Sequence, residues 1–130
     1  MSENLRKEIR EKIENGEYHC EKELTLSVIS GKYKVVIIWH LGHEGVHRFN
    51  ELQKLFPKIS HKMLTNQLKE LIDDGIVHRE VYSSVPPKVE YSITELGMTL
   101  VPLVDMMYDW GKMRMEQITG KTDETCCCDK

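Results

Sequence analysis

The 130-residue sequence has no long hydrophobic segment. Its longest uninterrupted apolar run, Val35 to Trp39, is far shorter than the roughly 20 residues that a membrane-spanning helix needs. The first ten residues, MSENLRKEIR, lack the apolar centre of a signal peptide. We therefore expect a cytoplasmic protein that has no membrane partner.

Cysteine is also scarce, with Cys20 alone and Cys126, Cys127 and Cys128 in a row near the end. Three adjacent cysteines cannot form a conventional disulfide framework among themselves, and a reducing compartment would leave all four as thiols. The three tail thiolates could bind a soft metal such as zinc or copper(I), but without outside ligands they would form a strained chelate. We assign no metal site to them.

The usual signatures of an enzyme are missing as well: there is no nucleophile elbow, no phosphate-binding glycine loop and no HExxH. Cys20 follows His19, but adjacent residues seldom orient a nucleophile and its base. His40, His43 and His47 have a spacing that invites a metal interpretation, yet no carboxylate or cysteine completes that set in sequence. We expect no catalytic residues, no metal and no cofactor, and therefore no enzymatic activity.

The remaining composition is that of an ordinary globular protein, with 40% hydrophobic and 30% charged residues. The length suits one domain. The net charge is −3, but from Val46 to Ile93 five Lys and two Arg stand against six Asp and Glu, a local charge of +1. Because only the contacting face must be positive, the overall charge does not exclude a nucleic-acid partner.

Apolar spacing and capping residues predict a series of helices in the first 74 residues. They cover 2–16, 21–31, 32–41, 48–56 and 61–74. The third is ambiguous, because its VVII segment favours a strand by residue type and a buried helix by length and flanking caps. We choose the helix.

The last two of these helices form a pair joined by a tight turn. Pro57 prevents the first from continuing, and Ser60 stands where the N-cap of the second belongs. In the second helix Leu64, Leu68 and Leu71 follow one face. The pattern predicts a helix-turn-helix whose second helix has a polar free side.

Two alternating segments, Val77–Tyr82 and Val89–Ile93, predict a β-hairpin with Pro86 and Pro87 at its tip. Thr94 can cap a further helix, which Pro102 should kink or split. A helix-turn-helix followed by a hairpin is a winged helix-turn-helix, so we predict an α+β, mainly α fold with N- and C-terminal dimerisation helices.

The free side of the second helix carries donors that suit the major groove of DNA, which is about 12 Å wide. Asn66 can pair with adenine, and Lys62 and Lys69 can reach phosphate or guanine. The alternative is an ordinary solvated helix face. The residues that we predict to bind DNA are Arg48, Ser60, His61, Lys62, Thr65, Asn66, Lys69 and, on a loop too stiff to fold back, Lys88.

The chain resembles the HxlR-type branch of the MarR-like bacterial transcription regulators. The segments that carry the resemblance follow the family's order and spacing from Cys20 to about Gly111: CEKELTLSVISGKYKVVIIWHL, RFNEL, ISHKMLTNQLKEL, DGIVHR, VPPKVEYSITELG and DWG. The resemblance implies a homodimeric repressor or activator, with the helix at Ser60 to Asp74 in the major groove, the loop near Lys88 as the wing, and terminal helices that pair the subunits.

The apolar stripes of the terminal helices agree with a homodimer, although they could instead cover the monomer's own core. The predicted dimerisation residues are Leu5, Ile9, Leu100, Leu103, Met107 and Trp110. Two paired helix-turn-helix units would place their recognition helices roughly 34 Å apart on a near-palindromic operator. We assign residues 1–120 to the DNA-binding domain with its terminal helices and 121–130 to a flexible cysteine-rich tail.

The resemblance also implies a role for Cys20, since family members usually carry a cysteine just before the first core helix and some use it to sense oxidants, quinones or aldehydes. His19 and Lys22 could stabilise a thiolate there, whereas Glu21 and Glu23 act the other way. A half-buried packing role for Cys20 is the alternative. For the whole chain, the competing hypotheses are a winged helix used for protein contact and a metal-responsive regulator that uses Cys126–Cys128.

Overall fold

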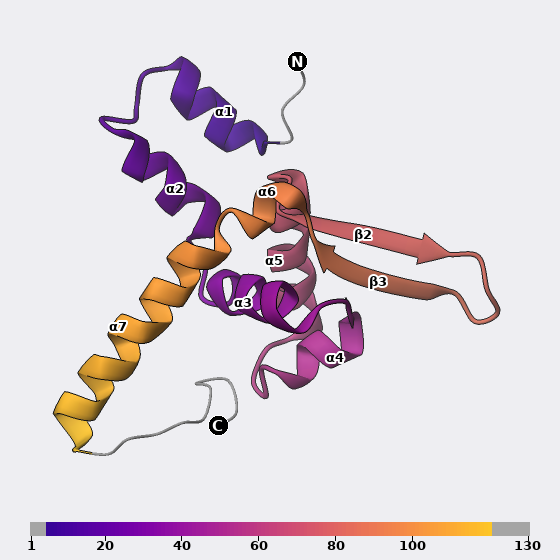
Figure 1. Ribbon diagram of the computed structural model, residues 1–130. Helices are drawn as coiled ribbons and strands as arrows, with labels where there is room; N and C mark the ends of the chain where they lie inside the picture. The colour runs from indigo at the N-terminus through magenta and orange to yellow at the C-terminus, as the bar shows by residue number, and fades with distance from the viewer. Residues whose placement is uncertain (1–4, 121–130) are drawn as a thin grey trace.

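The computed structural model describes residues 5–120, which contain seven helices and three short strands. The helices are α1 (Lys7–Glu14), α2 (Glu21–Ile29), α3 (Lys34–Glu44), α4 (Phe49–Lys54), α5 (His61–Asp73), α6 (Glu95–Met98) and α7 (Val101–Thr119), and the strands are β1 (His47–Arg48), β2 (Val77–Tyr82) and β3 (Lys88–Ile93). Figure 1 shows the β2–β3 hairpin projecting from one side of the central helices and α7 projecting from the other. The predicted tail, 121–130, lies outside the described residues.

The ambiguous VVII segment is helical, as predicted. Ile37, Ile38 and Leu41 of α3 are at most 1% exposed, because α3 lies at the centre of the molecule and packs against α5, α7 and β3. A Cβ on Gly42 would stand 2.6 Å from the Val101 side chain, so the absence of a side chain there lets α7 approach α3 closely.

No single helix among residues 5–120 is long and apolar enough to cross a membrane; only the pair α2 and α3, bent by 80° at its break, meets that test of length and composition.

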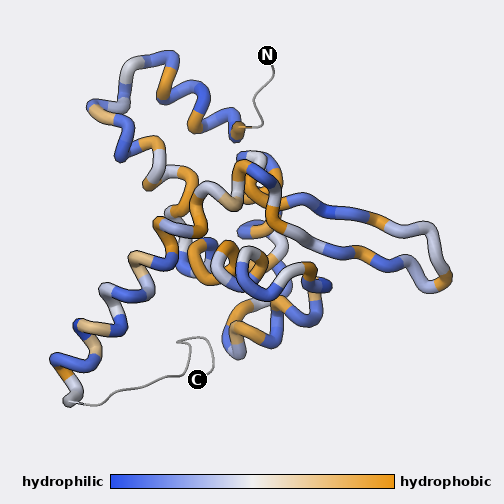
Figure 2. Tube along the Cα trace, in the orientation of Figure 1, coloured by the Kyte–Doolittle hydropathy of each residue, from blue (hydrophilic) through white to orange (hydrophobic). Residues whose placement is uncertain are grey.

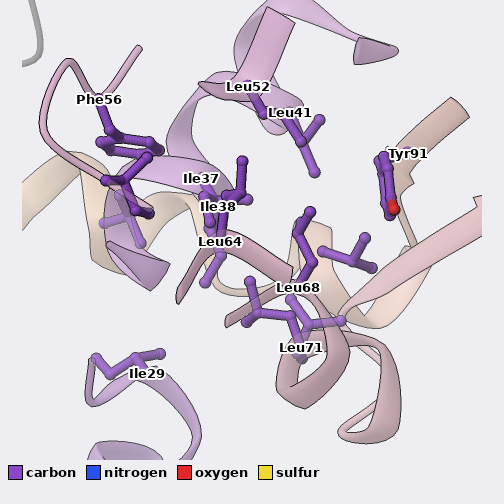
Figure 3. Close-up of a cluster of buried hydrophobic side chains, with 14 of the residues drawn as sticks. Ile29, Ile37, Ile38, Leu41, Leu52, Phe56, Leu64, Leu68, Leu71 and Tyr91 are labelled. Atoms are coloured by element: carbon purple, nitrogen blue, oxygen red, sulfur yellow. The ribbon is translucent and has the colours of Figure 1, made fainter. Parts of the chain in front are cut away.

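Helix α5 starts and packs as its sequence predicts. The Ser60 hydroxyl accepts a hydrogen bond from the Met63 N–H at 3.0 Å, which is an N-cap. Leu64, Leu68 and Leu71 are at most 1% exposed and point into the core formed with α3 and α4 (Figure 3). Figure 2 shows the same division along the whole chain, since hydrophobic residues gather in the central helices and most of the hairpin is hydrophilic.

The hairpin has the predicted strands, and a third strand joins it. Strand β3 lies between β1 and β2, with both neighbours antiparallel. Strand β1 was not predicted, because two residues are too few to display an alternating pattern. It pairs His47 with Tyr91 and Arg48 with Glu90, and thereby attaches the start of α4 to the base of the hairpin.

The chain breaks between α6 and α7, as Pro102 predicts. Thr94 caps α6 by accepting a hydrogen bond from the Gly97 N–H at 2.9 Å, and Pro102 occupies the first turn of α7, where a missing N–H costs nothing. A Cβ on Gly97 would stand 2.4 Å from the carbonyl oxygen of Ile76, so only glycine allows α6 to lie against the start of the hairpin.

The N-terminal helix is shorter than predicted and begins after Leu5, which is half-buried. Ile9 is 3% exposed, so its side chain is packed within the chain itself, whereas Ile13 is 46% exposed. Arg6 joins this segment to the rest of the molecule. Its Nε and its backbone N–H donate to the two carboxylate oxygens of Asp74 at 2.9 Å, and its Nη2 donates to the Ser27 carbonyl at 2.6 Å.

A second buried cation belongs to the same charge network. Lys34, at the start of α3, is 1% exposed and its Nζ lies 2.5 Å from Oε1 of Glu70, which also accepts from Arg6 at 3.2 Å. Two cations and the carboxylates of Glu70 and Asp74 therefore balance one another around the C-terminal end of α5. Removal of one partner from such a network leaves a buried charge uncompensated.

We predict that Asp74→Asn lowers the free energy of unfolding by about 1–3 kcal/mol, because Arg6 loses a charged acceptor in a site where the Asp74 side chain is fully buried. Asp73→Asn is the matched control. Its carboxylate is 42% exposed and its pair with Lys69 is worth less than about 0.5 kcal/mol. Urea denaturation at one protein concentration measures both, and equal losses would contradict the assignment.

Candidate nucleic-acid interface

The side of α5 opposite the core is polar and open to solvent. Ser60, Lys62, Thr65, Asn66 and Lys69 are all exposed. Their exposure follows from the helical period, since burial of one apolar stripe turns the residues between its members outward. The structure thus brings the predicted DNA-binding residues of this helix onto one accessible surface.

The N-terminal half of this surface is anchored to α4. The Phe49 ring lies 4.5 Å from the imidazole of His61, and the Thr65 hydroxyl donates to the His61 carbonyl at 2.8 Å. Within residues 5–120, the side chains of Lys62 and Asn66 make no hydrogen bond or ion pair. Their donors are therefore available to a ligand without the loss of an internal contact.

The C-terminal half of the same surface faces the N-terminal segment. Lys69 donates to Asp73 at 3.1 Å, four residues along the helix. An open groove of about 750 Å³ separates this part of α5 from the beginning of α1, and Asn66, Lys69, Asp73, Arg6 and Lys7 contribute to its walls. The N-terminal segment thus lies beside the C-terminal half of the helix.

Met63 is a candidate contact residue that the sequence interpretation missed. It is 44% exposed and lies on α5 between Lys62 and the start of the buried leucine stripe. In the major groove of DNA, an apolar side chain can contact the methyl group of thymine. The signal was present in the sequence, because Met63 does not belong to the three- and four-residue series of Leu64, Leu68 and Leu71.

Arg48 lies next to the N-terminal end of α5 although it comes from another element. It is exposed, and it is the N-cap of α4, with its N–H donating to Glu51 Oε1 at 2.8 Å. The following residue, Phe49, packs on His61. Strand β1 therefore positions Arg48 at the edge of the surface formed by α5.

Lys88 differs from its predicted position. It is the first residue of β3 rather than part of the loop, and its ammonium group turns back along the hairpin to within 3.2 Å of Glu90 and 5.1 Å of the Tyr82 ring centre. A hydrogen bond from Lys88 lowers the pKa of Glu90, and a hydrogen bond to Glu90 raises the pKa of Tyr82. The stiffness predicted for the loop does not restrict this side chain, which is long enough to reach Glu90 from the start of β3.

The predicted dimerisation residues of the C-terminal part are largely accessible. Leu103, Met107 and Trp110 are 37%, 43% and 64% exposed, and Leu100 is half-buried. The same helix exposes further apolar residues that were not predicted: Met106, Met113, Met115 and Ile118. Helix α7 therefore presents a long apolar surface that no other described part of the chain covers.

Cys20 is exposed and is the N-cap residue of α2. Its backbone N–H donates to Glu23 Oε2 at 3.0 Å, and the His19 N–H donates to the same oxygen. Both hydrogen bonds lower the pKa of Glu23, and the one from Cys20 has the larger effect. An exposed thiol does not fit the alternative of a half-buried packing residue. Within residues 5–120 there is no second cysteine, and Cys126–Cys128 lie outside the described residues.

The three histidines with metal-like spacing have other partners. His43 Nε2 lies 2.6 Å from Asp105 of α7, and His40 and His47 both contact Glu44. Across the described part of the chain, no group of three or more His, Cys, Asp and Glu side chains could hold a metal ion.

Comparison with known proteins identifies the family. The HxlR-like helix-turn-helix family matches residues 28–119. The chain is 54% identical over 99 residues to the uncharacterized HTH-type transcriptional regulator YdeP of Bacillus subtilis (strain 168), covering 76% of this chain and 77% of that protein.

Solved structures of the redox regulator HypR have the same fold. Its reduced form gives a TM-score of 0.73 at 49% identity, with 78% of this chain and 100% of that chain covered. Its oxidised form gives a TM-score of 0.69 at 54% identity, with 72% and 96% covered. The predicted winged helix-turn-helix fold is confirmed, and the chain belongs to the HxlR-like helix-turn-helix family of transcriptional regulators.

Proposed function

We propose that this transcriptional regulator acts in the cytoplasm as a homodimer that binds a near-palindromic operator in double-stranded DNA. The observation that carries the proposal is the face of α5 with Lys62, Thr65 and Asn66, which is exposed, polar and fixed by a capped, well-packed helix. A helix held in this way can enter the major groove as a rigid unit.

Within this proposal the contacts divide into two kinds. Asn66 forms a bidentate pair with adenine, and Lys62 binds guanine or phosphate beside it. Ser60 and the N-terminal N–H groups of α5 favour a phosphate. Arg48, Lys69 and Lys88 bind phosphates at the edges. Lys69 and Lys88 each exchange a carboxylate partner for a phosphate, and for Lys69 this costs little because its pair with Asp73 is solvent-exposed and such pairs contribute only about 0–1 kcal/mol.

The dimer follows from the apolar surface of α7. Leu103, Met107 and Trp110 recur at four- and three-residue steps, which is the spacing that packs one helix against another. Pairing of two copies through this surface would remove it from water and present two α5 helices to one side of the DNA. Exposed apolar surface of this extent marks an interaction site in most soluble proteins.

Cys20 provides the site at which an oxidant or electrophile acts in this proposal. Its exposure and its place at the first turn of α2 make the thiol accessible, and α2 contacts Arg6 through the Ser27 carbonyl. The similarity to HypR, which is described as a redox regulator in oxidised and reduced forms, supports a redox role. A modification that shifts α2 would move the terminal helices and change the spacing of the recognition helices.

We predict that Asn66→Ala relaxes base preference at one operator position and costs about 1–3 kcal/mol there. Lys69→Ala is the matched control from the same face. It should weaken binding to all sequences alike and reduce the slope of log affinity against log salt by about one. Binding measured across an operator library at several salt concentrations separates the two. Unchanged relative affinities in the Asn66 variant would rule out its base contact.

We predict that Leu103→Asp converts the dimer to a monomer, because a carboxylate in the α7 interface would be buried without a partner. Val85→Asp provides the control, since Val85 is also an exposed apolar residue but lies at the tip of the hairpin. Sedimentation velocity should show a monomer for the first variant and a dimer for the second. If both sediment like the wild type, the subunits pair elsewhere.

We predict that Cys20→Ser binds the operator as tightly as the wild type but no longer releases it on treatment with diamide or a quinone. Removal of the tail after residue 120 tests the second thiol. If the truncated protein still responds, Cys126–Cys128 are not required for the switch. An unchanged response of the Cys20 variant would place the sensor elsewhere.

A further inference from the structure

The turn between α3 and β1 contains a histidine whose two ring nitrogens both face acceptors. Nδ1 of His47 lies 2.8 Å from the Gly45 carbonyl oxygen, and Nε2 lies 3.1 Å from Oε1 of Glu44. A neutral imidazole has a single N–H and can satisfy only one acceptor. The geometry therefore corresponds to the imidazolium form, which donates from both nitrogens and carries a positive charge.

The carboxylate of Glu44 can balance the positive charge of this imidazolium. Its Oε1 also accepts from Nδ1 of His40 at 2.9 Å, so the carboxylate lies between two imidazoles. The hydrogen bond from His40, with a further one from His47, lowers the pKa of Glu44 despite some desolvation. The carboxylate consequently stays ionised throughout the range in which histidines titrate.

The ring is enclosed enough for its hydrogen bonds to matter. The His47 side chain is 12% exposed, and its strand neighbour is the buried Tyr91. The titratable and charged groups on the elements packed around it include His40, His43 and Glu44 of α3, Arg48 of β1, Glu51 of α4, Arg79 of β2, Glu90 and Tyr91 of β3, and Asp105 of α7. Glu44 lies within hydrogen-bond distance of the ring, and the centre of the His40 ring lies 6.4 Å from its centre.

The place of His47 connects this protonation to the DNA-binding surface. The next residue, Arg48, pairs with Glu90 in β3, caps α4 and precedes Phe49, which packs on His61 at the start of α5. The two hydrogen bonds of His47 fold the Glu44–Gly45 turn against β1. Loss of one proton breaks one of them and loosens the turn that positions Arg48.

We propose that His47 is a positioning residue whose protonation holds Arg48 against the DNA, so that operator binding depends on pH through this ring. The proposal rests on the proposed function and adds to it a dependence of operator binding on pH. Because the binding-competent form is the protonated one, affinity is greatest at the acid end of the histidine range and falls as pH rises. Direct contact of the ring with phosphate is not required.

The experiment measures operator affinity by fluorescence anisotropy between about pH 6 and about pH 8.5 at constant ionic strength. The wild type should lose about three- to tenfold more affinity over this range than His47→Gln, which cannot be protonated. His78→Gln is the matched control, because His78 is an exposed strand histidine paired with Glu80. It should keep the pH dependence of the wild type, and an unchanged dependence in the His47 variant would overturn the proposal.

A second measurement does not depend on DNA or on the folding of a variant. Ring 15N chemical shifts of the wild-type protein at the acid end of this pH range should show both nitrogens of His47 protonated. A signal from one unprotonated nitrogen would overturn the proposal even if the protein binds its operator. Conversely, a doubly protonated ring in a protein that binds no DNA would reject the proposed function and leave the assignment of the proton intact.

Discussion

The packing of one face of α5 against α3 is the contact on which the rest of the structure depends. Leu64, Leu68 and Leu71 are almost fully buried, as are Ile37 and Ile38. Burial of one such side chain contributes about 1.5–3 kcal/mol, and a whole domain is stable by only about 5–15 kcal/mol. These few residues therefore fix the rotation of α5 about its axis. That rotation decides which polar residues face solvent, so the core also determines the proposed DNA-binding surface.

Electrostatic contacts fix the position of α5 along its axis where apolar packing alone would allow a small slide. Arg6 and Lys34 reach Glu70 and Asp74 from two different elements, and Asp74 has no exposed side-chain surface. Buried charges tolerate little displacement, since a longer distance restores the desolvation cost without the compensating attraction. The same contacts attach the N-terminal segment to the end of α5. A change in α1 or α2 can consequently reach α5 through Arg6.

The sequence predicted the parts of the fold that are governed by local chemistry. Ser60, Thr94 and Pro102 act where capping and proline geometry place them, and the VVII segment is a helix because its length and its buried surroundings outweigh β propensity. Contacts between distant residues were not predictable in this way. Strand β1 exists only because β3 pairs with it, and the ion pair of Lys88 depends on the register that brings Glu90 beside it.

For the site, the helical period gave the exposed face of α5 correctly, while Met63 was missed because only polar residues were considered as contacts. The sequence also did not reveal the contacts of the three histidines of the α3–β1 region. Their spacing suggested a metal, but in space His43 binds Asp105 of α7 while His40 and His47 share Glu44. Helix α3 thus connects the helix proposed for dimerisation to the turn that positions Arg48. The proposed DNA-binding surface and the helix proposed for dimerisation are therefore joined through contacts of α3.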